Sequence, residues 1–247
     1  MKCTMKKLVS KVMAIIILIC VLMGGGMSDV CDVLCVQTAT LIANAAESDT
    51  LTGSCGDSDS DVTYTWDKTI GLVVLSGTGK IKNYGESPFK NSDAVKTVMI
   101  SEGITSIGNS LFLGCSQLEN VVLPKSVTGI GNNAFDGCSA LQNIDLPSNL
   151  NYIGSRAFQS CKIEKIAIPS TVTVLKEYAF CECRRLSEVD LGDGLVTIEQ
   201  GCFRNTAITE IAFPSTLRNV YGYNFGAFSN CSIESVYVTD PSLMFKP

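Results

Sequence analysis

Phenylalanine recurs at a nearly constant spacing through the second half of the chain. Six residues hold the repeated position, separated by 23, 23, 22, 23 and 25 residues: Phe112, Phe135, Phe158, Phe180, Phe203 and Phe228. A regular period of this length is typical of a solenoid, in which each unit packs only against its neighbours. The period therefore predicts a repeat architecture with an extended surface, and it argues against most enzyme folds.

Each repeat begins with a short segment that alternates in polarity, as a β-strand does. In the unit that starts at Leu118, Val121 and Leu123 are expected to point inward, whereas Asn120 and Val122 point outward. Seven such units start at Val95, Leu118, Leu141, Ile163, Leu186, Ile208 and Ile233. We therefore predict a sheet of seven parallel strands, spaced about 4.8 Å apart.

Turn residues follow these strands at fixed places. Proline closes the strand in four units, because it has no N–H to offer a neighbouring strand: Pro124, Pro147, Pro169 and Pro214. Ile-Gly pairs such as Ile130-Gly131 then mark a second turn. The Ala-Phe pair that follows returns apolar volume to the core, where each Phe ring is expected to stack over the next one.

The segment before the repeats differs in pattern and predicts an N-terminal β cap over residues 47–93. Residues 47–61 are small and polar, which indicates a loop. Val62, Tyr64 and Trp66 alternate with polar residues, and a second apolar run spans 72–75, so residues 62–84 are expected to form a hairpin. A solenoid needs such an atypical terminal unit, because its last apolar face has no further repeat to cover it.

Residues 1–46 are typical of an export signal and a processed segment. Four lysines precede an apolar run of 12 residues that spans 12–23. A membrane span needs about 20 residues, so this run fits a signal peptide better than an anchor. Ala43-Asn44-Ala45 offers a cleavage site before Ala46. We expect a protein that is secreted, extracellular or at the cell surface, with an uncleaved membrane-tethered N-terminus as the alternative.

The composition excludes several classes of function. The sequence has no histidine, which removes Ser-His-Asp and Cys-His catalysis and most zinc sites. The formal net charge is −5, and an acidic chain without a basic stripe is a poor ligand for nucleic acid. We expect no enzyme activity, no catalytic residue, no cofactor and no metal site.

Two clusters suggest chemistry, but each has a simpler interpretation. Cysteine holds one repeat position in five units, at Cys115, Cys138, Cys161, Cys183 and Cys231, and Thr206 interrupts the series. Stacked side chains run parallel, which suits disulfides and metal ligands badly, so a column of small buried thiols is favoured. The acidic segment 57–61 begins like a calcium loop, but Val62 and Lys68 occupy the places of its glycine and glutamate. A solvated loop is favoured there.

The repeat pattern, L-x-x-I-x-L-P-x-x-L-x-x-I-G-x-x-A-F-x-x-C, resembles the BspA-type leucine-rich repeats of bacterial surface proteins. The cap that often precedes such repeats is matched by Gly53-Ser54-Cys55-Gly56, Thr65-Trp66-Asp67, Gly71-Leu72 and Ser76-Gly77-Thr78-Gly79. The resemblance implies a leucine-rich-repeat solenoid over residues 94–247 that is displayed or secreted for adhesion to host or partner-cell proteins. The seventh unit lacks its second half, so 233–238 is expected to be a terminal capping strand or the start of a truncated repeat.

The outward strand positions form the candidate binding face, on the concave side of the expected solenoid. Its residues are Asn120, Val122, Asn143, Asp145, Lys165, Glu188, Asp190, Glu210 and Tyr237. Asp145 and Asp190 are expected two strands apart, but carboxylates on an open sheet lack the enclosure that raises the pKa of a catalytic acid. A second candidate is the aromatic insertion of the sixth unit, with Tyr221, Tyr223 and Phe225, which forms either a binding loop or a cover over the end of the stack.

These observations predict a non-enzymatic binding or adhesion module. The expected partner is an extracellular or host-surface protein, or a glycan, with no nucleic acid and no membrane span once the signal is removed. The chain is expected to be a monomer. The alternative is a structural repeat scaffold, or a fragment, with no ligand of its own.

Overall fold

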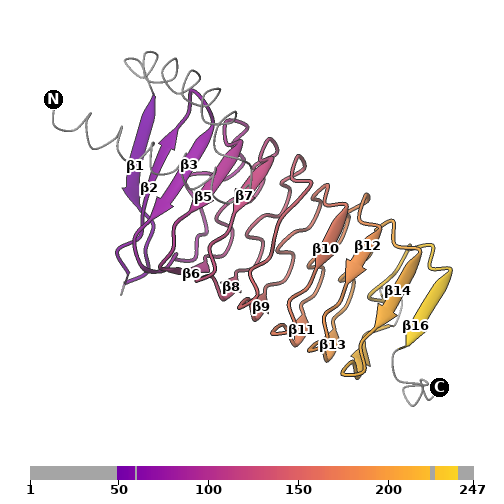
Figure 1. The fold of residues 1–247 in the computed structure, drawn as a ribbon. Helices are drawn as coiled ribbons and strands as arrows, with labels where there is room; N and C mark the ends of the chain where they lie inside the picture. The colour runs from indigo at the N-terminus through magenta and orange to yellow at the C-terminus, as the bar shows by residue number, and fades with distance from the viewer. Residues whose placement is uncertain (1–48, 59, 223–225, 239–247) are drawn as a thin grey trace, which may run out of the picture. The chain divides into compact units, whose positions relative to one another are not determined.

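The computed structural model describes residues 49–58, 60–222 and 226–238. All of these except Asp49 belong to one compact unit that starts at Thr50. Within them the chain coils as a β-solenoid of about seven turns without any helix, and so also without a helix able to cross a membrane (Figure 1). The predicted export signal and its cleavage site fall outside the described residues.

Most coils contribute one strand to a first face, which we call the long-strand face. Its strands are β3 (Leu72–Ser76), β5 (Thr97–Ile100), β7 (Asn120–Val122), β10 (Lys165–Ala167), β12 (Glu188–Asp190), β14 (Glu210–Phe213) and β16 (Ser235–Val238). All neighbouring pairs that form here are parallel, as the repeat pattern predicts. This is the face on which the outward strand positions were expected.

Each coil contributes a second, shorter strand to the opposite side, which we call the short-strand face. Its strands are β4 (Gly79–Lys80), β6 (Ile104–Ile107), β8 (Gly129–Ile130), β9 (Tyr152–Ile153), β11 (Val174–Leu175), β13 (Thr197–Ile198) and β15 (Asn219–Val220). They pair in parallel as one sheet of seven strands, from β4 at one end to β15 at the other. The Ile-Gly turns of the sequence lie at the ends of the strands β6, β8 and β9.

The long-strand face is interrupted, so the expected single sheet of seven strands is wrong. The strands divide into a five-stranded sheet that ends at β7, the pair β10–β12 and the pair β14–β16. The third coil has no strand on this side, and no backbone hydrogen bond joins residues 143–146 to a neighbouring coil within the described chain. Asn143 and Asp145 are both poor strand formers, but Asn120 and Asp190 stand at the same repeat positions within β7 and β12, so residue type alone does not explain the break.

The N-terminal cap extends the long-strand face. β2 (Thr63–Asp67) and β3 form the hairpin that the sequence predicts, and β3 then pairs in parallel with β5 of the first full repeat. The expected loop over 47–61 is wrong in part, because β1 (Thr50–Ser54) pairs antiparallel with β2. β1 is mostly exposed and has little apolar alternation, so the pairing of backbone groups along the edge of β2 gives it its place.

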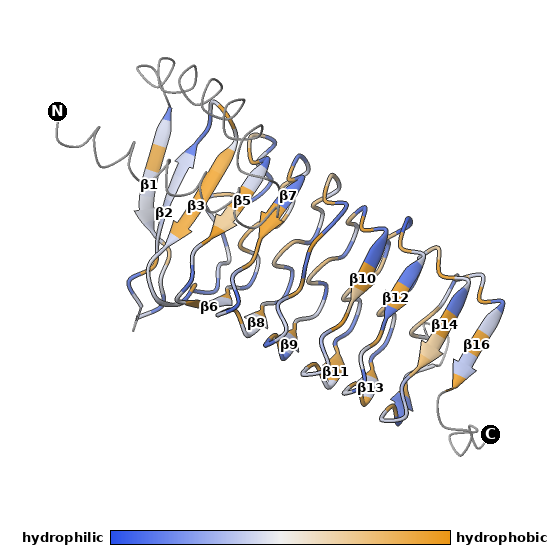
Figure 2. Ribbon diagram, viewed as in Figure 1, coloured by the Kyte–Doolittle hydropathy of each residue, from blue (hydrophilic) through white to orange (hydrophobic). Residues whose placement is uncertain are grey.

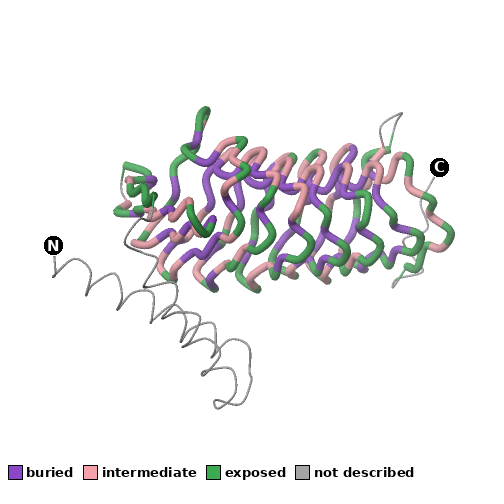
Figure 3. Tube along the Cα trace, turned by 90° about the horizontal axis from the view of Figure 1, so that it is seen from above, coloured by how far each residue is buried: buried purple, intermediate pink, exposed green. Residues whose placement is uncertain are grey.

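A column of stacked phenylalanine rings fills the coils, as the sequence period predicts. Successive ring centroids lie 5.2 to 5.7 Å apart, with interplanar angles of 6 to 24°, through Phe89, Phe112, Phe135, Phe158, Phe180, Phe203 and Phe228. Phe89 extends the column into the cap, where Tyr64 and Trp66 meet it edge-on. The sequence analysis did not include Phe89, although it lies 23 residues before Phe112 and fits the period, because the residues before it belong to the cap. The buried positions follow the inside of the coil (Figure 3).

A second column consists of thiols, and all eight described cysteines are free. Each ladder thiol donates to the carbonyl of a Phe one coil earlier, at sulfur–oxygen distances of 3.0 to 3.3 Å: Cys115, Cys138, Cys161, Cys183 and Cys231. Thr206 instead donates to Phe203 of its own coil, at 2.9 Å. Burial raises the pKa of Cys115 to about 12 and that of Cys161 well above its ordinary value. The interpretation as a buried thiol column agrees with this geometry.

The glycine of the Ile-Gly turn is required by the close approach of the neighbouring coil. A Cβ added at Gly131 would lie 2.7 Å from the backbone nitrogen of Asn109, and one at Gly154 would lie 2.6 Å from that of Asn132. Real Cβ atoms do not approach backbone this closely, so only glycine allows the coils to come together here. Glycine therefore sets a close spacing at the turns after β8 and β9, whereas Lys176 and Glu199 hold the same position after β11 and β13.

Candidate binding face

The sequence-predicted face residues all lie exposed along the long-strand side of the solenoid. They are Asn120, Val122, Asn143, Asp145, Lys165, Glu188, Asp190, Glu210 and Tyr237. Strand pairing brings Lys165 opposite Glu188 and Ala167 opposite Asp190, whereas Tyr237 lies opposite Ala212. Met99 departs from the outward pattern. It holds the position that Val122 holds in the next coil, but it is buried between its register partners Val74 and Val122.

The face changes character along the solenoid. In Figure 2 the strand β3 is hydrophobic over most of its length, whereas β12 is mostly hydrophilic. Val122 on β7 is a partly exposed apolar residue. From the third coil onward the outward positions carry Asp145, Glu188 and Glu210. The acidic part of the face, from the third to the sixth coil, thus includes the coil at which the sheet is interrupted.

An open hollow of about 880 Å³ lies on this acidic part. Its walls are the exposed strand residues of the third to sixth coils, with small Ala167 between them, and four larger apolar residues also contribute to its lining: Ile144, Leu146, Ile166 and Val189. Six of the nine sequence-predicted face residues line it, namely Asn143, Asp145, Lys165, Glu188, Asp190 and Glu210. Asn120, Val122 and Tyr237 lie outside it. No sequence pattern predicted the hollow itself, because its shape depends on how the coils are spaced.

The electrostatics of the hollow are unbalanced toward negative charge. Lys165 pairs with Glu188 at 2.6 Å, although both side chains are more than half exposed. Within the described chain no ion pair reaches Asp145, Asp190 or Glu210. One Asp190 carboxylate oxygen accepts a hydrogen bond from the Gly192 backbone nitrogen at 3.1 Å, which holds that side chain in place. The hollow therefore carries four carboxylates and one ammonium group.

The hollow is an open polar surface rather than an enclosed pocket. The hollow is open to solvent, and the described residues contain no group of three or more His, Cys, Asp or Glu side chains placed to hold a metal ion. Asp145 and Asp190 line the same hollow, with Ala167 between their coils. An open polar surface leaves charged groups accessible to a partner that covers it.

Tyr221, at the start of the aromatic insertion, lies apart from this face. Tyr221 follows β15 on the short-strand side, where its backbone nitrogen donates to Ile198 at 3.0 Å. Its side chain is exposed, so this ring does not cover the end of the phenylalanine column. Tyr223 and Phe225 lie outside the described residues.

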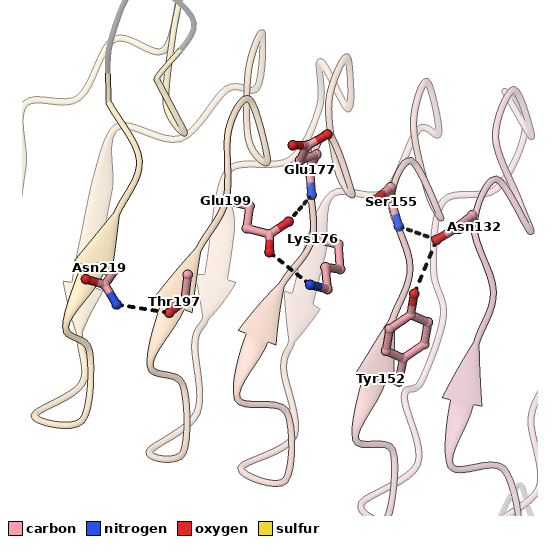
Figure 4. A network of polar contacts seen from close by, with 8 residues as sticks. All are labelled: Asn132, Tyr152, Ser155, Lys176, Glu177, Thr197, Glu199 and Asn219. Carbon is pink, nitrogen blue, oxygen red and sulfur yellow. Dashed lines mark hydrogen bonds and ion pairs between the residues drawn. The ribbon is translucent and has the colours of Figure 1, made fainter.

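Sequence reasoning missed a polar network that connects coils on the short-strand side (Figure 4). The side-chain oxygen of Asn132 accepts from the Ser155 backbone nitrogen at 2.9 Å and from the Tyr152 hydroxyl at 3.3 Å. Three coils further on, Glu199 accepts from the Glu177 backbone nitrogen and pairs with Lys176. At these turns the side-chain oxygens accept hydrogen bonds that backbone carbonyls accept in a regular sheet. We therefore interpret the network as structural. The Asn residues that recur after the Ile-Gly pairs were the available signal.

The parallel strands, the phenylalanine column and the open face define a leucine-rich-repeat solenoid. The profile of the BspA type leucine rich repeat region matches six copies, over residues 63–138 and 105–234. The chain therefore belongs to the BspA-type leucine-rich-repeat family. A comparison with curated proteins finds no match.

Solved bacterial structures share this fold. A leucine-rich repeat protein from Bacteroides ovatus ATCC 8483 is 29% identical, with a TM-score of 0.58, and the match covers 71% of this chain and 51% of that one. A leucine rich cell surface protein from Faecalibacterium prausnitzii A2-165 is 24% identical, with a TM-score of 0.59, over 80% of this chain and 56% of that one. The pneumococcal vaccine antigen PcpA is 17% identical, with a TM-score of 0.50, over 75% of this chain and 49% of that one. The chain thus spans about half the length of these structures.

Proposed function

We propose that the chain is an exported, non-enzymatic module that binds an extracellular or host-surface protein through its long-strand face. The observation that carries the proposal is the open hollow, which is lined by exposed side chains. The face that contains it lies over the buried core of stacked coils. A protein partner that covers such an open, rigid surface gains contact area without a conformational change of the solenoid. We expect the module to act as a monomer.

Two similarities support an extracellular role. The family is that of BspA-type repeats, and one solved neighbour is described as a cell surface protein, another as a vaccine antigen. The apolar run at 12–23 after four lysines is consistent with export. Leucine-rich-repeat solenoids in general are scaffolds for protein interaction. The sequence has no histidine, so catalysis that depends on this residue does not compete with that interpretation.

Label-free binding of the chain to a panel of extracellular-matrix and plasma proteins tests this function. We expect saturable binding by the folded protein and none by a thermally unfolded sample. Asn143→Arg and Asp190→Arg place bulky cations in the hollow and should weaken binding without unfolding the protein. Thr173→Arg is the matched control, because Thr173 is exposed on the coil segment beside β11, away from the hollow.

The alternative is a structural repeat scaffold without a ligand. That function predicts no saturable binding to any member of the panel. Binding that is unchanged by both hollow variants but lost in Thr173→Arg would contradict the assignment of the face.

A further inference from the structure

We propose that the hollow on the long-strand face binds an extended, lysine- or arginine-rich segment of a protein partner. This inference rests on the proposed binding function and names the chemistry of the partner for that same face. It depends on three features of the hollow: its charge, its apolar lining and its place at the break in the sheet. Each feature is an independent property of the described residues.

The charge of the hollow selects a cationic ligand. Four carboxylates line it, and only that of Glu188 has a cationic partner, Lys165. Asp145, Asp190 and Glu210 are available to an incoming group, since no ion pair reaches them within the described chain. A surface of one sign attracts ligands of the opposite sign and repels anionic ones. Sulfated or sialylated glycans and nucleic acids are therefore disfavoured here.

The lining of the hollow selects a ligand with long aliphatic stems. Leu146 and Val189 are partly exposed and contribute apolar surface among the acidic residues, whereas Ile144 and Ile166 line the hollow but are buried. Lysine and arginine bury their methylene stems along apolar surface while the charged end stays with water or with carboxylates. A small inorganic cation would leave this apolar lining uncovered. The combination fits basic side chains of a polypeptide better than it fits a free ion.

The break in the sheet lies at the same surface. Residues 143–146 form no backbone hydrogen bond with either neighbouring coil in the part of the chain that the structure describes. Asn143 and Asp145 line the hollow. An extended peptide carries a donor and an acceptor at nearly every residue, so it can use polar groups that a regular sheet would have paired. The interruption is thus consistent with a surface that accepts a main chain as well as side chains.

The volume and shape of the hollow indicate how much of a partner it holds. A hollow of about 880 Å³ accommodates a few side chains, and its lining extends from Asn143 in the third coil to Glu210 in the sixth. Parallel strands repeat at about 4.8 Å, so the acidic residues are spaced at multiples of this distance along the solenoid axis. An extended segment that lies along this axis would therefore present basic residues at comparable intervals to successive coils.

The test uses the folded chain and a fluorescent oligolysine of eight residues, with oligoglutamate of the same length as the opposite-charge probe. We expect saturable binding of oligolysine, measured by fluorescence anisotropy, and none of oligoglutamate. Asp190→Asn combined with Glu210→Gln should weaken oligolysine binding roughly tenfold, because both carboxylates are exposed and unpaired. Added salt should weaken the binding of the unmodified chain, since screening shortens the reach of surface charges to about 10 Å at 0.1 M.

Matched variants separate the hollow from the overall negative charge. Asp93→Asn combined with Glu177→Gln removes the same two charges from exposed positions outside the hollow and should leave binding unchanged. Ala167→Trp fills the hollow without changing its charge and should abolish binding. Thr173→Trp adds the same ring to an exposed position elsewhere and should have no effect. Circular dichroism of each variant checks that the fold is kept.

Three results would overturn the inference. The first is no binding of oligolysine, and the second is equal weakening by the two charge pairs, which would show attraction to net charge alone. The third is a protein partner from the panel whose binding is insensitive both to salt and to the hollow variants. In that third case binding to an extracellular protein stands, but neither the hollow as its site nor a basic segment as its ligand does. A silent panel together with hollow-specific oligolysine binding would instead count against the host-protein function.

Discussion

The short-strand face and the long-strand face belong to the same coils but differ in regularity. The short strands form one sheet of seven, with glycine at the close approaches and a polar network across the turns. The long strands divide into separate sheets, and their outward positions carry different side chains from coil to coil. The difference indicates that coil spacing is fixed more strictly on the short-strand side and in the core than on the long-strand side, where the outward side chains vary.

The largest expected effect comes from breaking the core that both faces share. Phe158 is fully buried between Phe135 and Phe180, with ring centroids at 5.4 Å on each side. Phe158→Ala should lower the free energy of unfolding by about 3–5 kcal/mol, because it leaves a cavity that stacked coils cannot close. Urea unfolding followed by circular dichroism measures this loss. Tyr221→Ala, at an exposed ring, is the control, and equal losses in both variants would refute the stacked core.

The thiol column predicts a loss of stability at alkaline pH. Burial raises the pKa of Cys55 to about 11, and those of Cys115 and Cys183 to about 12, whereas a thiol in the unfolded chain titrates near pH 8.5. Between about pH 8.5 and pH 11 the unfolded chain loses these protons and the folded chain keeps them. The free energy of unfolding should therefore fall as pH rises, by about 1.4 kcal/mol per pH unit for each such thiol.

The measurement is urea unfolding at pH 8 and pH 10 under reducing conditions. Other groups titrate in this range, so the comparison is with Cys115→Ala, whose stability should fall less steeply by the contribution of one thiol. If the free energy of unfolding fell equally with pH in the two proteins, the Cys115 thiol would not differ between the folded and the unfolded chain. That result would show that solvent reaches the thiol from one of the faces.

A smaller effect is expected from glycine on the short-strand face. Gly131→Ala places a methyl group 2.7 Å from the Asn109 backbone nitrogen, so neighbouring coils must separate, at a cost of roughly 1–3 kcal/mol. Gly129→Ala, two residues away, meets nothing closer than 3.7 Å and should be nearly neutral. Urea midpoints of the two variants measure the difference. A Gly131→Ala protein as stable as Gly129→Ala would mean that coil spacing is not fixed on this side.

The smallest effect is expected on the long-strand face. Glu188→Gln breaks the pair with Lys165, but both side chains are largely exposed, so the free energy of unfolding should change by less than about 1 kcal/mol. The same urea measurement applies, with Glu86→Gln as the control, since its pair with Lys90 is also exposed on the Glu86 side. A loss as large as that of Gly131→Ala would remove the distinction between the two faces.

The sequence was sufficient where a single residue type repeats in a single environment. The spacing of Phe112, Phe135 and Phe158 predicted the stacked rings, and the cysteine period predicted thiols in a column rather than disulfides. It was insufficient where backbone pairing alone decides, as in β1, whose residues have almost no apolar alternation. Phe89 escaped the pattern because the residues before it belong to the cap and not to a regular unit.

The candidate face shows the same division. Alternation along Asn120, Val121 and Val122 placed the outward residues correctly, but the same rule failed at Met99, which lies buried between Val74 and Val122. No local pattern predicted that the strand would be absent at 143–146 or that a hollow would form there. Those features depend on contacts between coils that are more than twenty residues apart in the chain.

The sequence by itself determined the repeat, the direction of the strands and the contents of the core, because a period of fixed length places like residues over like residues in every coil. Only the tertiary structure decided where the sheet of the long-strand face is interrupted and which carboxylates surround the hollow. The physical reason is that stacking repeats the average coil, whereas the spacing and pairing of two particular coils depend on the side chains and backbone groups that meet between them.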